Sequence, residues 1–578
     1  MFSWILFTAL LIPTAYTLPN DIRCRCRPTE PCWPTEPQWN AFNRSVSGNL
    51  LAVKPVGAVC HDPTYNEPAC WDVSALQWTN WEFGKTIKDS CFIQSPRGQP
   101  CNRGRISLFS VLARSVKDIQ ETVKFATKHN LRLVIRNTGH DFLGRSSAPD
   151  SLQISTSFLN SINFHDDFTA QGAGRGTRGH GAAVTVGAGV QFKDLYAAAG
   201  MQKLSVVGGF ASTVGVAGGY IQGGGHSMLG PWKGMAVDHA LEFKVVTAKG
   251  LHVIANQYQN SDLFWALRGG GGGTFGVVTS VTLKAHPDAP LVAVQFDMSR
   301  PSADEVFWAC AEAIHAHMPS VSDEGGSGYF RIIPKMTPNS AVLTIRNYFI
   351  EHTDIAPINE IYSPLMAALE RLTNQTRLVT ISAEPSISGT YETVLPEVES
   401  TSGVNVALGS RLLSRSLLES DTGPRRLSRA LSSLPPLRQA ESILVSLVAG
   451  GAVAKNTRSK TALHPAWDKA LVHIVVTRLF GPNATDAAVD EFYKSLTQKD
   501  TAALRSLEPG SMGAYYNEAD PNEKDFAENF WGADNYERLK RVKSKWDPKD
   551  LFIVRKGVGS ERWDDSGFCR STWFGGMR

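Results

Sequence analysis

Apolar residues recur three or four positions apart over Val116–Asn130, which predicts an amphipathic helix. Ser115 precedes this pattern and Asp118 follows three residues later, a combination typical of a helix N-terminal capping box. The short apolar run Leu131–Ile135 comes next and predicts a buried strand. A strand is also expected over Ser107–Val111. The chain therefore opens its regular part with a strand, a helix and a second strand.

The same kind of pattern continues to residue 288. Strands are expected over Leu152–Ser155, Ile162–Phe164, Ala183–Val190, Asp238–Val246 and Val277–Ala285, with a short helix over Gln191–Gly200.

After Pro287 the pattern changes to longer strands and helices, and residues 289–505 are interpreted as a second α+β domain. Strands are expected over Val292–Phe296, Phe330–Ile333, Ala341–Phe349 and Leu471–Arg478, and helices over Glu305–His317 and Asn359–Leu372. Residues 411–440 are rich in Arg and Ser, which predicts a solvated helix pair with a loop.

The end of the chain, residues 506–578, holds a predicted short strand over Gly513–Asp520 and a helix over Asn529–Lys545. Because side chains alternate along a strand, Tyr515 and Asn517 would share one face, and Glu518 would lie on the other. Core structure is expected to resume at Leu551–Val554.

The composition is that of an ordinary folded protein. Of 578 residues, 42% are hydrophobic and 19% are charged, and this length predicts two or more domains. The formal net charge is +4, from 58 basic and 54 acidic residues, which gives no reason to expect nucleic acid or an anionic membrane as a partner.

Residues 1–17 are apolar and lead to the small residues Ala15 and Thr17, a pattern typical of a secretory signal peptide. An uncleaved signal anchor is the alternative, because the first residues lack Lys and Arg. No later segment is predicted to cross a membrane. Sequons at Asn43, Asn374 and Asn483 fit N-glycosylation in the secretory pathway.

Nine cysteines are present, and seven of them lie between Cys24 and Cys101, in an N-terminal extension over residues 18–104. In a secreted protein this predicts disulfides; zinc is the rival, but paired C-x-x-C spacing is missing. An odd number leaves at least one cysteine outside any disulfide. Cys310, in a helical apolar stripe, is the candidate for that buried thiol, and Cys569 is expected to pair back to the N-terminal extension.

Candidate chemistry gathers between residues 105 and 288. Asn137–Asp141 forms a turn-type cluster at the exit of a strand, where several N–H groups can face one phosphate. The glycine-dense coil Val207–Gly230 carries β-branched and hydroxyl residues, unlike a Gly/Ser linker, and predicts a chain that wraps a large ligand. For Gly269–Gly273, a flexible hinge and a close backbone approach are both open. The loop Gln171–His180 is no dinucleotide fingerprint, because no strand feeds it.

Together these motifs resemble the secreted fungal FAD-linked oxidoreductases of the berberine-bridge-enzyme type, and within them the isoamyl-alcohol-oxidase-like group. The residues that carry the resemblance are RNTGHD at 136–141, STVGVAGGYIQGGG at 212–225, DLFWALRGGGGGTFGVV at 262–278, YYNEAD at 515–520 and FWGADNY at 530–536. The fold implied is α+β, with a two-part FAD-binding domain of the PCMH type over residues 105–288 and a substrate domain with an antiparallel sheet over 289–505. Residues 506–578 would complete the FAD domain.

The resemblance implies a covalent bond from His140 to the flavin 8α-methyl group. Many relatives add a cysteine link at the position matched by Ala211, so we expect a single link here. It further implies cofactor contacts from the residues Arg136, Asn137, Thr138, Gly139, His140, Asp141, Ser212, Thr213, Gly215, Gly218, Gly219, Val277 and Asn517.

The implied reaction removes a hydride from a small organic substrate, an alcohol or a secondary metabolite, and passes the electrons to O2, giving H2O2. Tyr515 and Asn517 are the catalytic candidates. Tyr515 would act as a base, which needs a pKa lowered from about 10, or would only pack on the flavin. His464 is a weaker candidate, for which a solvated loop residue is the plain alternative. The base in the substrate domain stays unassigned.

Three other functions share part of this pattern. A flavin dehydrogenase or oxidative cyclase would carry the same motifs, a non-catalytic glycoprotein is disfavoured by His140 and the glycine coils, and an NAD-dependent reductase lacks its fingerprint. We expect a monomer. The substrate and the disulfide connectivity are not readable from the sequence.

Overall fold

A computed structural model describes residues 24–76, 91, 93, 95–376, 379–391, 406–455, 460–481, 484–510 and 512–571. The predicted signal peptide at 1–17 and the sequon at Asn483 lie outside these residues. None of the helices in the described ranges is both long and apolar enough to cross a bilayer.

Two small sheets build the first part of the molecule. The four-stranded sheet has the order β1-β2-β4-β3, with β2, β4 and β3 parallel, and the five-stranded sheet has the antiparallel order β5-β6-β10-β8-β9. Their strands are β1 (Leu50–Ala52), β2 (Phe109–Leu112), β3 (Leu133–Arg136), β4 (Leu152–Ser155), β5 (Ile162–His165), β6 (Ala183–Gly187), β8 (Ala240–Val246), β9 (His252–Asn256) and β10 (Val277–Lys284).

The helices of this part include the predicted one, α3, which begins after Ser115 with the expected capping box to Asp118. The helices are α1 (Glu36–Ser45), α2 (Glu67–Leu76), α3 (Val116–Lys128), α4 (Phe192–Met201), α5 (Gly230–Lys233) and α6 (Ser261–Leu267). A two-stranded ribbon of β7 (Leu204–Ser205) and β11 (His286–Pro287) ends this part.

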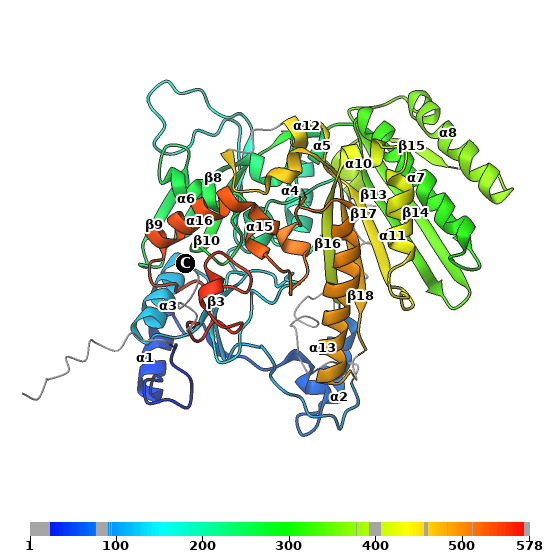
Figure 1. Ribbon diagram of the computed structural model, residues 1–578. Coiled ribbons are helices and arrows are strands. Elements are labelled where there is room, and N and C mark those ends of the chain that lie inside the picture. Colours follow the sequence, from blue (N-terminus) through cyan, green and yellow to red (C-terminus); the bar gives the residue numbers. More distant parts are fainter. Residues whose placement is uncertain are drawn as a thin grey trace, which may run out of the picture.

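The second part is one antiparallel sheet of seven strands in the order β15-β12-β14-β13-β17-β18-β16, and Figure 1 shows helices α7, α8 and α11 beside it. Its strands are β12 (Leu291–Arg300), β13 (Gly326–Thr337), β14 (Ser340–Ile350), β15 (Thr380–Glu384), β16 (Val406–Ser414), β17 (Ser442–Leu447) and β18 (Ala470–Leu479). Its helices are α7 (Glu305–Asp323), α8 (Ala356–Thr373), α10 (Arg415–Glu419), α11 (Gly423–Ser432), α12 (Gly451–Lys455), α13 (Asp486–Ser495) and α14 (Ala502–Leu507). The α+β class is confirmed.

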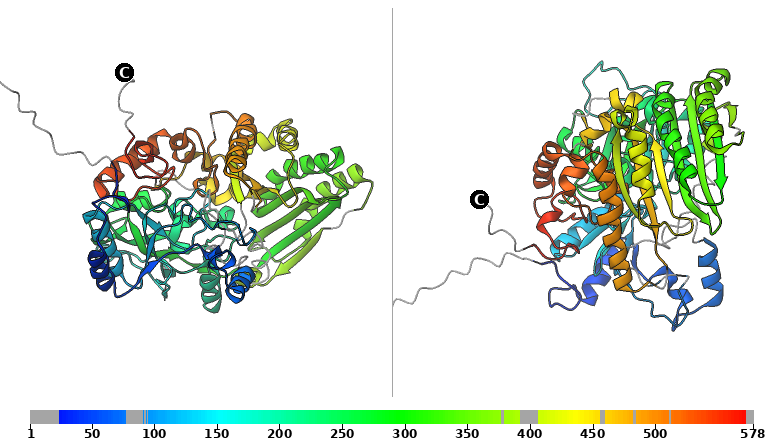
Figure 2. Two further views of the ribbon diagram at one scale, coloured as in Figure 1. Left: turned by 90° about the horizontal axis from the view of Figure 1, so that it is seen from below. Right: turned by 45° about the vertical axis from the view of Figure 1, so that its right-hand side comes forward.

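The end of the chain returns to the first part. Helix α16 (Ala533–Trp546) lies beside α6 in Figures 1 and 2, and α15 (Phe526–Trp531) packs against α16. The disulfide Cys24–Cys569 then joins the two ends of the described chain, as predicted. Three local disulfides use Cys26–Cys32, Cys60–Cys70 and Cys91–Cys101, and Cys310 is a buried thiol, again as predicted.

Residues 411–440 differ from the predicted solvated helix pair. The helices α10 and α11 are present, but Arg411 to Ser414 complete β16, whose residues are all buried. Arg411 is tolerated there because Glu523 accepts its hydrogen bond at 2.7 Å, and Ser414 donates to Glu508. Long-range carboxylates therefore override a local composition that indicates exposure.

The predicted strand over Gly513–Asp520 is wrong. This segment is extended only to Tyr515 and then forms a 3-10 turn over Tyr516–Glu518, closed by the Glu518 N–H donating to the Tyr515 carbonyl at 3.0 Å. The alternation of faces inferred for a strand does not apply to it. The predicted helix over Asn529–Lys545 is also divided in two, at Gly532, whose φ of 77° is left-handed.

A buried ion pair fixes the C-terminal segment to the first part. Lys543 is 1% exposed and its ammonium donates to Asp547 at 2.5 Å and to the carbonyls of Thr274 and Phe552 at 2.7 and 2.6 Å. Asp547 in turn accepts from the backbone N–H groups of Leu551 and Phe552. Burial lowers the pKa of Lys543, and the Asp547 carboxylate opposes this effect. The pair is stable only as a complete set.

We predict that Lys543→Met lowers the free energy of unfolding by about 3–5 kcal/mol, because it leaves the Asp547 carboxylate buried without its cation. Urea denaturation followed by tryptophan fluorescence measures this loss. Lys124→Met is the matched control: its 2.8 Å ion pair with Glu121 is exposed, and its removal should change stability by about 0.5 kcal/mol or less. Equal unfolding midpoints for the two variants would contradict the anchoring role.

Candidate active site

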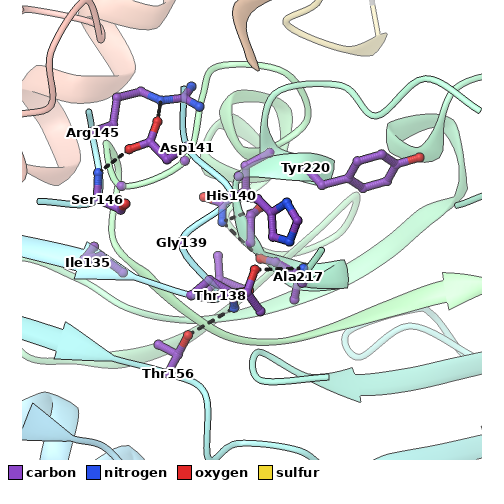
Figure 3. Close-up of a pocket in the computed structure, with 18 of the residues that line it drawn as sticks. Ile135, Thr138, Gly139, His140, Asp141, Arg145, Ser146, Thr156, Ala217 and Tyr220 are labelled. Atoms are coloured by element: carbon purple, nitrogen blue, oxygen red, sulfur yellow. Dashed lines mark hydrogen bonds and ion pairs between the residues drawn. The ribbon is translucent and has the colours of Figure 1, made fainter. Parts of the chain in front are cut away.

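The turn after β3 carries the first group of predicted site residues. The Asn137 amide donates to the Thr156 hydroxyl at 3.1 Å and to the Ala188 carbonyl, which fixes the start of the turn. Gly139 has a left-handed φ of 94°, and a Cβ there would lie 2.8 Å from the Arg136 guanidinium. The turn therefore needs glycine at this position, and it presents His140 immediately afterwards (Figure 3).

The glycine coil docks directly onto this turn. A Cβ on Gly215 would lie 1.6 Å from Asn137 Oδ1, and a Cβ on Gly218 would lie 2.9 Å from the same side chain. The Gly215 N–H donates to the Thr138 hydroxyl at 3.2 Å, and His140 Nε2 lies 2.8 Å from Thr213 Oγ1. The turn after β3 and the glycine coil thus form one surface, although they are 70 residues or more apart in sequence.

The turn and the coil border a cleft that is lined largely by glycine main chain and polar side chains. Its lining consists of Ile135, Asn137, Thr138, Gly139, His140, Asp141, Arg145, Ser146, Thr156, Val214, Gly215, Ala217, Gly218, Gly219, Tyr220, Gln222, Gly272, Gly273, Gly276 and Val278. Asn137 Oδ1 and Gln222 Oε1 are buried and accept no hydrogen bond from any described residue. Acceptor atoms, glycine main chain and a histidine fit a ligand that combines a polar chain with a flat ring.

The five-glycine stretch also approaches other backbone closely. Of the two interpretations of Gly269–Gly273, a close backbone approach is therefore confirmed in preference to a flexible hinge. A Cβ on Gly269 would lie 2.7 Å from the Leu463 backbone nitrogen, and one on Gly272 would lie 2.9 Å from the Gly219 Cα. Gly272 and Gly273 line the cleft opposite the turn.

Five of the predicted cofactor-contact residues do not line the cleft: Arg136, Ser212, Thr213, Val277 and Asn517. Val277 is fully buried in the core, and its neighbour Val278 takes the lining position. Arg136 lies behind the turn against Gly139, whereas Ser212 and Thr213 are buried in the coil. Asp141 does reach the cleft, but Figure 3 shows its carboxylate turned toward Arg145 and Ser146, with 2.9 and 2.6 Å hydrogen bonds. Although burial opposes it, Arg145 holds the pKa of Asp141 below its ordinary value.

Tyr515 and Asn517 meet the glycine coil through their side chains. The Asn517 amide donates to the Gly219 carbonyl at 3.0 Å and to the Tyr515 hydroxyl at 2.7 Å, and Asn517 Oδ1 accepts from Arg145 at 3.2 Å. The Gly225 N–H donates to the same Tyr515 hydroxyl at 3.2 Å. The 3-10 turn, rather than a strand, brings the two residues together.

Burial and the nearby Glu518 carboxylate raise the pKa of Tyr515 above its ordinary value. A base role needs the opposite shift, so this environment favours Tyr515 as a neutral hydrogen-bonding group. His464 caps a 3-10 helix, η7 (Pro465–Asp468), through the Ala466 N–H, and its Nε2 lies 3.0 Å from the Glu528 carbonyl. Both ring nitrogens thus have structural partners, and neither the loop nor the ring is simply solvated.

The sequence pattern did not single out His226 and His473, which lie near Tyr515 and beside Glu518. His226 Nε2 lies 3.0 Å from Glu518 Oε1, and His473 Nδ1 lies 3.5 Å from Glu518 Oε2. The His226 and His473 rings lie 5.1 and 5.6 Å from the Tyr515 ring. Two features of the sequence could have pointed to these histidines. His226 directly follows three glycines, and His473 is a polar residue within the apolar strand β18.

Two sequence families match this chain. The family described as "FAD binding domain" matches residues 108–256, which hold the turn, the coil and the five-stranded sheet up to β9. The family described as "Berberine and berberine like" matches residues 514–559, which hold Tyr515, Asn517 and Glu518. The two matched segments meet where Asn517 donates to the Gly219 carbonyl and accepts from Arg145.

An uncharacterized FAD-linked oxidoreductase of Arthroderma benhamiae is 48% identical over 596 residues and covers 99% of this chain and 100% of that protein. The VAO-type flavoprotein MtVAO615 of Myceliophthora thermophila C1 has a TM-score of 0.83 at 30% identity, covering 95% of this chain and 100% of its own.

A glucooligosaccharide oxidase of Acremonium strictum, described with a 6-S-cysteinyl, 8α-N1-histidyl FAD, shares the fold with a TM-score of 0.67 at 17% identity. That match covers 90% of this chain and 99% of the other. Together with the cleft, these matches establish that the chain belongs to the berberine-bridge-enzyme-like FAD-linked oxidoreductases, enzymes of the VAO flavoprotein fold.

Proposed function

We propose that this enzyme is a secretory-pathway oxidase that removes a hydride from a small organic substrate, with FAD held by a single covalent bond through His140 and with O2 as the electron acceptor, giving H2O2. The single observation that carries the proposal is His140 at the exit of the turn, inside a cleft lined by the glycine coil. Bound FAD supplies the hydride-accepting ring and the route of electrons to O2.

The chain's own residues would hold this cofactor in two ways. Main-chain groups at Gly139, Gly215 and Gly218 border the cleft and can approach the phosphates, and glycine at these positions leaves room for the Arg136 and Asn137 side chains packed against them. Val277 and Ser212 would then contribute packing to the walls rather than contacts, because both are buried behind the lining. Asp141 would act through Arg145, which also donates to Asn517.

The cysteines support a single link. Eight of the nine form disulfides in the described chain, and Cys310 lies on α7 in the core below the seven-stranded sheet. Ala211 stands in the coil two residues before Thr213, the partner of His140, and its methyl group cannot form a thioether. The oligosaccharide oxidase that shares this fold is described with a cysteinyl and a histidyl link, so the two proteins would differ at this point.

The disulfides and the sequence of residues 1–17 support a secretory-pathway location. Asn374 is the exposed residue with left-handed backbone that ends α8, a position open to glycosylation. Asn43 instead has its side-chain oxygen occupied, because it accepts a hydrogen bond from the Leu50 N–H. Both sequons stay predictions, as does the monomeric state.

We predict that flavin absorbance stays with the acid-precipitated wild-type protein and is released from His140→Ala. The reason is that acid unfolds the protein and frees any cofactor that is held only by contacts. His165→Ala is the control, because this histidine bonds Thr185 on the five-stranded sheet instead of facing the cleft, and it should keep its flavin. Flavin that stays with precipitated His140→Ala would reveal a second attachment and contradict the single link.

We predict that Gly215→Ala abolishes flavin incorporation, because its Cβ would collide with Asn137 and force the coil off the turn. The φ of Gly215 is −78°, so the effect would be steric and would not come from backbone strain. The flavin-to-protein absorbance ratio of the purified variant measures it. Gly98→Ala, where a Cβ meets nothing within 4 Å, should keep a full complement of flavin. Full flavin content in Gly215→Ala would show that the coil does not need its contact with Asn137.

We predict that one H2O2 forms for each substrate molecule oxidised in air. The distinguishing measurement combines oxygen consumption with a peroxidase-coupled assay over a panel of primary and secondary alcohols. A dehydrogenase would bleach the flavin without oxygen uptake and would need an added dye to turn over. That result would move the proposal to the dehydrogenase or oxidative-cyclase alternative.

A further inference from the structure

Three polar side chains form a row across the seven-stranded sheet. Tyr329 on β13 pairs with Ser446 on β17, and Ser446 pairs with His473 on β18. Directly paired residues of antiparallel strands point to the same face of a sheet. The Tyr329 ring lies 4.9 Å from Phe210, which precedes Ala211, and the His473 ring lies 5.6 Å from Tyr515. The row therefore faces the glycine coil and the C-terminal segment.

Each member of the row has a buried polar atom without a hydrogen-bond partner in the described chain. These atoms are Tyr329 Oη, Ser446 Oγ and both ring nitrogens of His473, and both Ser446 and His473 are 0% exposed. A buried polar atom left unsatisfied destabilises a protein by about 1–3 kcal/mol. A polar ligand placed against this row would supply hydrogen-bond partners for Tyr329, Ser446 and His473 together.

The Glu518 carboxylate lies beside the His473 ring, within ion-pair distance but without a hydrogen bond to it. Glu518 Oε2 lies 3.5 Å from His473 Nδ1, while its other oxygen lies 3.0 Å from His226 Nε2. Burial lowers the pKa of His473 to about 4, an effect that Glu518 opposes and His226 assists. Burial raises the pKa of Glu518, but His226 and then His473 outweigh it and keep the carboxyl ionised. A neutral ring whose Nδ1–H faces the carboxylate leaves Nε2 as a proton acceptor.

We propose that His473 is the catalytic base of this enzyme, that Glu518 positions it, and that the row with Ser446 and Tyr329 binds the hydroxyl group of an alcohol substrate. This inference rests on the proposed function. In the step, the O–H bond breaks and its proton passes to His473 Nε2. The O–H electron pair forms the carbonyl π bond, and the carbon-bound hydrogen leaves as hydride, with its two electrons, to the FAD that serves as oxidant.

Tyr515 is the competing base, and its contacts argue against it. Its hydroxyl oxygen already accepts two hydrogen bonds, from the Gly225 N–H and from the Asn517 amide. The other groups that face His473 are Glu518, His226 and the rings of Trp467 and Tyr515. Among these, only the Glu518 carboxylate can stabilise a positive charge on His473 by direct ion pairing.

A divalent cation is the second competitor, because ligand atoms of His226, His473 and Glu518 lie within 4.8 Å of one another. The 3.0 Å contact of His226 Nε2 with Glu518 is already a normal hydrogen-bond distance, so the carboxylate is satisfied without a metal. Elemental analysis of the purified holoenzyme decides the point, and one equivalent of zinc, iron or manganese would overturn the assignment of His473 as a base.

The test uses 4-nitrophenol as a probe, because its absorbance reports whether it is bound as the phenol or as the phenolate. Bound to the wild-type holoenzyme, it should ionise at least one pH unit below its pH midpoint in free solution, a tenfold change in the ratio of the two forms. The physical reason is that a bound phenolate adds a second negative charge beside Glu518, which raises the pKa of His473 from its value near 4 and lets Nε2 take the proton. The readout needs neither turnover nor a known substrate.

His473→Gln should abolish this shift, and Glu518→Gln should reduce it, because the ring stays but loses its charged partner. His315→Gln is the matched control: this histidine is equally buried and bonds Ser428 through Nδ1, on the helical side of the sheet. A shift that survives in His473→Gln, or a wild-type enzyme that does not bind the probe, would overturn the proposal. A flavin released by acid from the wild type would instead contradict only the covalent link.

Discussion

The structure depends on the absence of side chains where the glycine coil meets the turn after β3. Asn137 fills the space in front of Gly215 and Gly218 so closely that a single methyl group at Gly215 would overlap its oxygen. The amide is itself fixed by Thr156 on its other side. Because this contact sets the position of both chain segments, it also sets where His140 stands and how wide the cleft is.

The C-terminal segment is the second constraint, and it depends on the first. Asn517 can donate to the Gly219 carbonyl only when the coil lies against the turn, and its oxygen then accepts from Arg145, the partner of Asp141. Lys543 lies on helix α16. Its buried pair with Asp547 holds this helix against the Thr274 carbonyl, at the end of the five-glycine stretch. The last part of the chain therefore supports the glycine coil and the five-glycine stretch that line the cleft.

Local patterns were sufficient to predict what local physics decides. The capping box of Ser115 and Asp118, the strand carrying Arg136 and the buried Cys310 depend on near neighbours in sequence, and the structure has them. The family motifs also located the turn and the coil. The prediction that Arg411 lies in a solvated segment was wrong. Its charge is paired with Glu523, 112 residues away in sequence, and no local pattern reveals such a partner.

His473, the candidate base, could not be predicted from the sequence, because its partners too are distant along the chain. His473 looks like an imperfection in an apolar strand until Tyr329, Ser446 and Glu518 are placed around it by strands and a turn that are distant in sequence. Tyr515 was easier to find because it belongs to a recognisable motif. Its environment, with two donors on its oxygen, suits orientation better than proton transfer.

One short turn joins the two chemical halves of the site. Asn517 and Glu518 are neighbours in the 3-10 turn, yet Asn517 bonds the glycine coil and Arg145, whereas Glu518 bonds His226 and approaches His473 on the seven-stranded sheet. In a strand these two side chains would also diverge, but Tyr515 would then lie too far from Asn517 for the 2.7 Å hydrogen bond that the turn provides. The turn thus couples the position of the cofactor cleft to the position of the proton acceptor. A displacement of one domain against the other would change the contacts of Asn517 and Glu518.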